Sequence, residues 1–117
     1  MRIMIIEDND ILREKIGGLA SRLETVSTVC LVKDCENLPG VIADMKPGVV
    51  LIDLNCAKDF LEEIRDIKNT IPGTRVIALL ENSDVQFGAV EMSRLMNADA
   101  LIEKKKLFSD LSNILVK

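Results

Sequence analysis

Acidic side chains and one lysine stand directly after short apolar runs of this chain. Glu7 and Asp8 follow the first run, and Asp53 ends a later one. Lys104 stands just beyond the last run. If these runs are parallel strands of one sheet, the side chains meet at its carboxyl edge, where α/β sheets bind ligands. Carboxylates gathered there repel one another unless a cation or protons relieve them. Because the candidate ligands are oxygens, Mg²⁺ is expected, with Mn²⁺ as the alternative.

The apolar residues alternate between short strand-like runs and longer stretches with helical spacing. Strands are predicted at 2–6, 27–32, 49–52, 76–80 and 100–102. Helices are predicted at 10–24, 38–45, from 59 to the turn at 71–73, from 83 to about 97, and at 107–116. Asp59 with Glu62 is typical of a helix cap, and so is the segment 83–86. In the first helix, the spacing of Ile11, Leu12, Ile16, Leu19 and Leu23 predicts a buried face.

Strands that alternate with helices imply a parallel sheet covered on both faces. Right-handed crossovers leave few topologies, and the flavodoxin-like order 2-1-3-4-5 suits five strands best. The expected fold is therefore α/β, a doubly wound five-stranded parallel sheet of (βα)5 type. It is expected to occupy residues 1–117 as one domain.

The composition excludes several classes of function. The chain of 117 residues is 48% hydrophobic and 29% charged, as globular domains are, but only 3% aromatic. A formal net charge of −4 argues against direct binding of nucleic acid. There is no His, so the commonest general base is missing. The first apolar run is too short for a signal peptide or a membrane span, and the three Cys residues form no CxxC motif. A cytoplasmic protein with reduced thiols is expected.

The strand and helix count, with acids after the first and third strands and a lysine after the fifth, resembles the receiver domain of two-component response regulators. The resemblance covers the whole chain. It implies that Asp53 is the phosphoacceptor and that Glu7 and Asp8 occupy the acidic-pair positions. Asp8 would then be a direct metal ligand, Glu7 an indirect one, and Asn55 would offer its backbone carbonyl. Lys104 would pair with the phosphoryl oxygens, while the carboxylate of Asp53 attacks phosphorus.

The chain departs from the receiver pattern at several positions. Leu80 stands where receivers carry Thr or Ser, and the missing charge-assisted hydrogen bond would contribute roughly 1.5–3 kcal/mol. Leu101 stands where an aromatic switch residue is usual, so Leu80 and Leu101 are expected to pack together. The segment 54–58 lacks the usual Met-Pro and Asp-Gly elements and is expected to be a shortened loop leading to the cap at Asp59. Lys105 replaces a usual Pro.

Two functions follow from the resemblance. The first is a phosphorelay domain that accepts phosphate on Asp53 from a histidine kinase or phosphotransfer protein. It would signal through the helix at 83–97, the strand at 100–102 and the helix at 107–116, a surface that could also form a homodimer. The second is a pseudo-receiver that binds partners without phosphate, as Leu80 and Leu101 favour. The retained acids and Lys104 favour the first.

Other classes fit poorly. A haloacid-dehalogenase-like phosphatase needs paired acids after its first strand and a second acid to protonate the leaving group. A flavodoxin-like FMN carrier needs a phosphate loop and aromatic rings, which this chain lacks. The resemblance therefore implies a signalling phosphoprotein of the cytoplasm and not an enzyme, beyond weak self-catalysed phosphotransfer and dephosphorylation. Partners in a membrane are not expected. Whether the chain is a stand-alone regulator or a piece of a larger one stays open.

Overall fold

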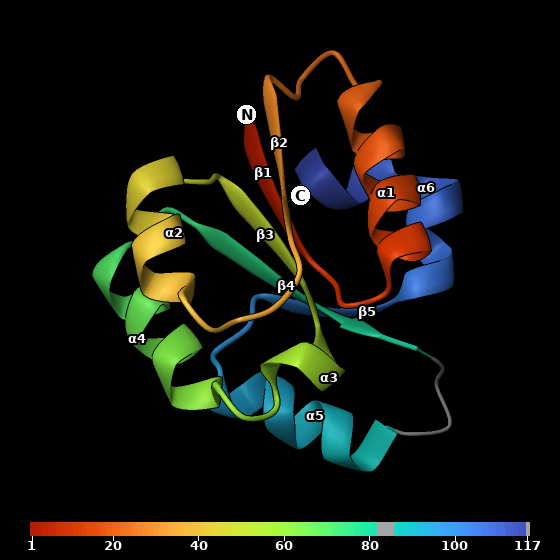
Figure 1. The fold of residues 1–117 in the computed structure, drawn as a ribbon. Helices are drawn as coiled ribbons and strands as arrows, with labels where there is room; N and C mark the ends of the chain where they lie inside the picture. Colours follow the sequence, from red (N-terminus) through yellow and green to blue (C-terminus); the bar gives the residue numbers. More distant parts are fainter. Residues whose placement is uncertain (82–85, 117) are drawn as a thin grey trace.

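A five-stranded parallel sheet forms the centre of the computed structural model, which describes residues 1–81 and 86–116 (Figure 1). The strands are β1 (Arg2–Ile6), β2 (Thr28–Val32), β3 (Val49–Asp53), β4 (Arg75–Leu80) and β5 (Ala100–Glu103). The helices are α1 (Asp10–Ser21), α2 (Leu38–Met45), α3 (Leu54–Ala57), α4 (Leu61–Thr70), α5 (Gln86–Leu95) and α6 (Lys104–Val116). All predicted strands are confirmed, with ends that differ by one residue at most.

The strand order is β2-β1-β3-β4-β5, so the predicted flavodoxin-like topology is confirmed. The register pairs Ile6 with Ile52 and places Asp53 opposite Leu79. The carboxyl ends of β1, β3 and β4 therefore lie at one edge of the sheet. The order reverses between β1 and β3, and this is the point where ligands of such sheets bind.

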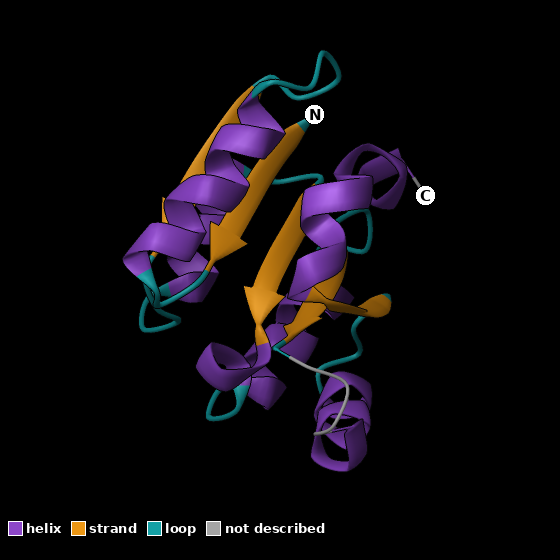
Figure 2. Ribbon diagram, turned by 90° about the vertical axis from the view of Figure 1, so that its right-hand side faces the viewer, coloured by secondary structure: helices purple, strands orange, loops and turns teal. Residues whose placement is uncertain are grey.

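Two layers of helices cover the sheet, α2, α4 and α5 on one face and α1 and α6 on the other (Figures 1 and 2). Side chains of a strand alternate between these faces. In β1, Met4 and Ile6 belong to the hydrophobic core under α2, α4 and α5. Ile3 and Ile5 belong to the core under α1 and α6. Since both faces are covered, the central strands are almost continuously apolar, which explains why they were recognisable in the sequence.

The prediction of a loop at 54–58 with a helix cap at Asp59 is wrong. Residues 54–57 form the single-turn helix α3, so the described residues contain six helices and not five. The cap lies earlier because the Asp53 carboxylate accepts a hydrogen bond from the backbone N–H of Cys56. Helix α4 follows Phe60, which makes no side-chain cap. The chain thus turns into a helix directly at the end of β3, and this short turn stands beside the site.

Other boundaries also differ from those predicted. Helix α1 ends at Ser21 and not at residue 24, because a turn bonds the Leu23 N–H to the Ala20 carbonyl. Ile11 lies on the outer face of α1, 70% exposed. Helix α6 begins at Lys104, where it continues from β5 without a loop. The predicted cap at 83–86 falls largely outside the described residues. Within the described parts of the chain, no helix is both long and apolar enough to cross a membrane.

Two neighbouring glycines in α1 differ in their surroundings, and this difference can be measured. A Cβ on Gly18 would meet nothing within 4 Å, whereas one on Gly17 would lie 2.8 Å from Cδ2 of Leu31. Gly18→Ala is expected to raise the free energy of unfolding by about 0.5–1 kcal/mol, since Ala is the better helix former. Gly17→Ala gains less, because the half-exposed Leu31 must rotate away. Urea unfolding followed by far-UV circular dichroism tests this, and equal gains would contradict it.

Candidate functional site

A cavity of about 470 Å³ opens at the carboxyl edge of the sheet, beside the point where the strand order reverses. It contains most of the residues predicted from the sequence to do chemistry. These are Glu7, Asp8, Asp53, Asn55, Leu80 and Lys104. Leu101 is not among the lining residues and packs in the hydrophobic cluster to which Leu80 also belongs.

Lys104 is the centre of the polar contacts in this cavity. Its ammonium lies 2.6 Å from Oε1 of Glu7, 2.8 Å from Oδ1 of Asp53 and 3.0 Å from Oε2 of Glu81. The Lys104 side chain is only 8% exposed, so these contacts take the place of water. Lys104 reaches the cavity because it is the first residue of α6, immediately beyond β5. Lys105 and Lys106, in contrast, are exposed, as expected for solvated lysines.

The electrostatics of the site follow from this arrangement. Burial disfavours the charge of Lys104, but the carboxylates of Asp53, Glu7 and Glu81 outweigh burial and raise its pKa above the ordinary 10.5. The contribution of Lys104 to stability is therefore complete below that value and is lost only as the pH rises through the higher folded-state pKa. For Glu7, burial is the largest effect and raises the pKa, although the contact with Lys104 opposes it.

Glu7 is held by its own strand end and by the start of α1. Its Oε2 accepts a hydrogen bond from the Asn9 N–H at 3.1 Å, and Asn9 in turn caps α1 by accepting from the Leu12 N–H. The guanidinium of Arg13 donates to the Glu7 carbonyl at 2.7 Å. With 1% exposure, Glu7 is a fixed part of the wall beside Lys104.

Asp53 is the buried carboxylate that faces the cavity from β3. Oδ1 contacts Lys104, and Oδ2 accepts the Cys56 N–H at 3.2 Å. These two contacts, one to each oxygen, orient the carboxylate. Asp53 lines the cavity, where a ligand held by Lys104 would also meet it.

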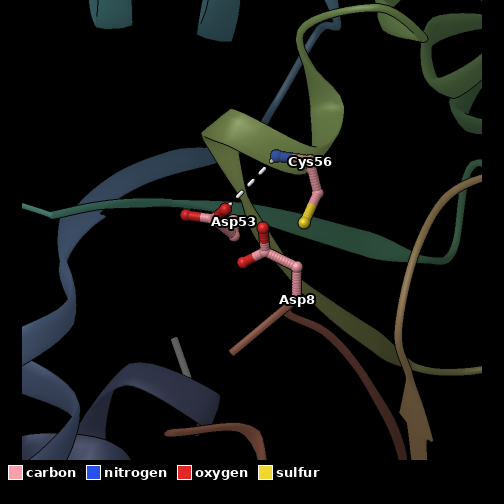
Figure 3. Close-up of side chains that lie close together, drawn as sticks. All are labelled: Asp8, Asp53 and Cys56. Carbon is pink, nitrogen blue, oxygen red and sulfur yellow. Dashed lines mark hydrogen bonds between the residues drawn. The ribbon is translucent and has the colours of Figure 1, made fainter. Parts of the chain in front are cut away.

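The group Asp8, Asp53 and Cys56 places two carboxylates and a thiol side by side (Figure 3). One donor atom from each lies within 4.8 Å of the others, and Asp8 is exposed. Two carboxylate ligands at a solvent-accessible edge suit Mg²⁺, which prefers oxygen and keeps several waters. Burial and the charges of Asp53 and Asp8 raise the pKa of the Cys56 thiol to about 12, so this sulfur stays protonated and is a poor ligand for Mg²⁺. The oxygen donors predicted from the sequence therefore fit that cation.

Sequence reasoning missed Glu81. It follows β4 directly, as Asp53 ends β3, and it lines the cavity with its carboxylate on Lys104. The signal was present in the sequence, because an acid stands directly after the predicted strand 76–80. Because the carboxyl ends of parallel strands lie at one edge of the sheet, an acid after the fourth strand is expected beside the acids that follow the first and third strands.

Comparisons with known proteins bear on the fold of the chain. No family model matches the chain. The chain is 27% identical over 116 residues to the transcriptional regulatory protein DegU of Brevibacillus brevis, with 92% of this chain and 49% of DegU covered. It thus spans about half the length of this curated relative.

Solved structures extend the comparison. The non-phosphorylated receiver domain of the stress response regulator RcsB from Escherichia coli superimposes with a TM-score of 0.79 at 20% identity, covering 99% of this chain and 90% of that one. The fold is that of a response-regulator receiver domain. The isolated RcsB domain from Salmonella enterica serovar Typhimurium, in the presence of phosphomimetic BeF3−, matches with a TM-score of 0.74 at 19% identity, covering 96% and 86% of the two chains. The receiver resemblance inferred from the sequence is confirmed at the level of the fold.

Removal of the Lys104 charge is expected to destabilise this receiver fold. In Lys104→Met, Glu7 and Asp53 stay buried without their cation, which costs about 3–5 kcal/mol at neutral pH. The deficit should shrink as the pH falls, because a protonated carboxyl no longer needs the ammonium. Lys106→Met is the matched control, since Lys106 is exposed and a surface substitution of this kind changes stability by about 0.5 kcal/mol or less. Urea unfolding at several pH values measures both variants, and similar losses would rule out the central role of Lys104.

The Cys56 thiol is expected to react slowly. A pKa of about 12 in place of the ordinary 9.0 lowers its thiolate fraction near pH 8 about a thousandfold. Alkylation with iodoacetamide at pH 8, mapped by peptide mass spectrometry, should therefore be at least ~100-fold slower at Cys56 in the folded protein than in urea. Comparable rates in the two states would show that the thiol is not protected as described.

Proposed function

We propose that this chain is a phosphoacceptor receiver domain of a two-component system, phosphorylated on Asp53. The observation that supports this is the contact of Asp53 Oδ1 with the Lys104 ammonium at 2.8 Å, beside the exposed Asp8, in a cavity at the switch point of the sheet. A nucleophile, a cation for the transferred group and a second carboxylate for a metal stand together. The donor is a histidine kinase or a phosphotransfer protein, since receivers take their phosphoryl group from histidine.

The proposed reaction uses the carboxylate of Asp53 as the nucleophile. One of its oxygens forms a bond to phosphorus, and the bond from phosphorus to the donor imidazole nitrogen breaks. The electron pair of that bond stays on the nitrogen, which takes up a proton. Lys104 neutralises charge on the phosphoryl oxygens and needs no large movement to do so, because it already contacts Asp53.

The residues that would hold Mg²⁺ are Asp8 and Asp53, with the backbone carbonyl of Asn55 in α3 as a third ligand. Mn²⁺ would fit the same oxygens. When bound, the cation would supply positive charge to the phosphoryl oxygens and relieve repulsion among the carboxylates. Glu7 acts indirectly, because its carboxylate is occupied by Lys104 and by the Asn9 N–H.

Phosphorylation is proposed to act through protein–protein contacts, which makes the domain a signalling module and not an enzyme. The surface of α5, β5 and α6 is the proposed output face and the proposed homodimer contact. Val90 and Leu95 on α5 are partly exposed apolar residues of that face. Direct nucleic-acid binding by this acidic domain and contact with a membrane are not part of the proposal, and its location is the cytoplasm.

Incubation with Mg²⁺ and acetyl phosphate, followed by intact-mass measurement, tests the proposal. Wild-type protein should gain the mass of one phosphoryl group, and Asp53→Asn should gain none. Asn is the matched replacement because its side-chain oxygen can still accept the Cys56 N–H that caps α3. Asp8→Asn should slow the gain, since it removes a metal ligand. The absence of an adduct on wild-type protein, or an adduct that persists in Asp53→Asn, would contradict the proposal.

A further inference from the structure

Glu81 makes a contact that the phosphoacceptor chemistry does not require. Its Oε2 lies 3.0 Å from the Lys104 ammonium, and Glu81 is one of the residues that line the cavity. The Glu81 side chain is 75% exposed, in contrast to the buried carboxylates of Glu7 and Asp53. The third partner of Lys104 is therefore a solvated carboxylate in the wall of the cavity.

Three carboxylates already compete for the Lys104 ammonium. They all lie within 3.0 Å of it, and the contact with Glu81 also has hydrogen-bond geometry. A phosphoryl oxygen can bind Lys104 well only if one of these carboxylates leaves or shares its donor. Two anions on one buried cation also repel each other more strongly than they would in water.

Glu81 is the carboxylate that can leave at the lowest free-energy cost. Glu7 is 1% exposed, and its other oxygen is held by the Asn9 N–H, so its release would strand a buried charge. Asp53 is the residue that would carry the phosphoryl group. Glu81 already faces solvent and can be rehydrated as it moves away, as exposed ion pairs allow.

We propose that Glu81 is an internal counter-anion that occupies Lys104 in the unmodified domain and is displaced by the phosphoryl group. This inference rests on the proposed phosphoacceptor role of Asp53. It assigns Glu81 a positioning role, because Glu81 acts on the reacting group only through Lys104. In the unmodified state it holds down both anion affinity and the rate of phosphorylation.

The displacement also supplies a signal at the end of β4. Receivers carry a hydroxyl on the last residue of this strand, and Leu80 provides none at that place. Glu81 is the next residue, so its release from Lys104 changes the chain at the same point where the hydroxyl would have acted. Phosphorylation is then coupled to Glu81, at the end of β4, by the loss of an ion pair in place of the gain of a hydrogen bond.

The test compares the binding of beryllofluoride with Mg²⁺ to wild type, Glu81→Gln and Glu91→Gln by NMR titration. Glu81→Gln should bind roughly fivefold more tightly or better, which corresponds to the loss of one partly exposed ion pair near 1 kcal/mol. Glu91→Gln is the matched control: it removes one negative charge from an exposed ion pair on α5 that does not line the cavity. It should bind as wild type does. Because Glu81 is exposed, its variant is expected to fold, which circular dichroism verifies.

Each outcome decides one of the two proposals. Tighter binding by Glu81→Gln alone, or binding by that variant where wild type shows none, supports the counter-anion role. Equal affinity in all three proteins, or weaker binding by Glu81→Gln, overturns the counter-anion role. Either result leaves the phosphoacceptor role of Asp53 standing. No binding by any of the three contradicts both, since a vacated Lys104 would still fail to admit the anion. The initial rate of acetyl phosphate labelling of Glu81→Gln should rise in parallel with affinity.

Discussion

The structure depends on one buried ammonium that must balance several carboxylates. Lys104 contacts Glu7, Asp53 and Glu81, and Asp8 adds a fourth negative charge to the same cavity. These groups come from the ends of β1, β3 and β4 and from the start of α6. The parallel sheet aligns the carboxyl ends of these strands and so brings the charged groups together in one cavity. The excess of negative charge left over is what makes the edge receptive to a divalent cation.

The sequence was sufficient to predict the sheet and much of the site, for a physical reason. Strands buried on both faces are apolar throughout, so their ends are marked by the first charged residue. Glu7 and Asp53 are such residues, and each proved to lie at the carboxyl edge. Lys104 is not the first charged residue after its strand, because Glu103 precedes it, and its role was inferred from the resemblance to receiver domains. Order and handedness rules then left few ways to arrange the strands.

The features that sequence reasoning missed depend on single hydrogen bonds or contacts between side chains. The cap of α3 is set by Asp53 and the Cys56 N–H, whereas Asp59 with Glu62 offered the stronger local pattern for a helix start. The helix begins after Asp53 and not at Asp59 because Lys104 holds one oxygen of the Asp53 carboxylate. The other oxygen then accepts the N–H of Cys56 in the following turn. Ile11 matched the helical spacing but lies on the outer face, since α1 is rotated to bury Ile16.

The apolar residues Leu80 and Leu101 need not mean that the site has lost its ability to respond. They belong to one hydrophobic cluster and stabilise the face of the sheet beneath the cavity. A packed cluster is rigid, so a response that relied on their rotation would be costly. Charges lining the cavity can still rearrange, because the Glu81 side chain is exposed and its contact with Lys104 is a single ion pair at 3.0 Å. A change of net charge at Asp53 acts first on its shared cation, and the partner of that cation that water can solvate moves first.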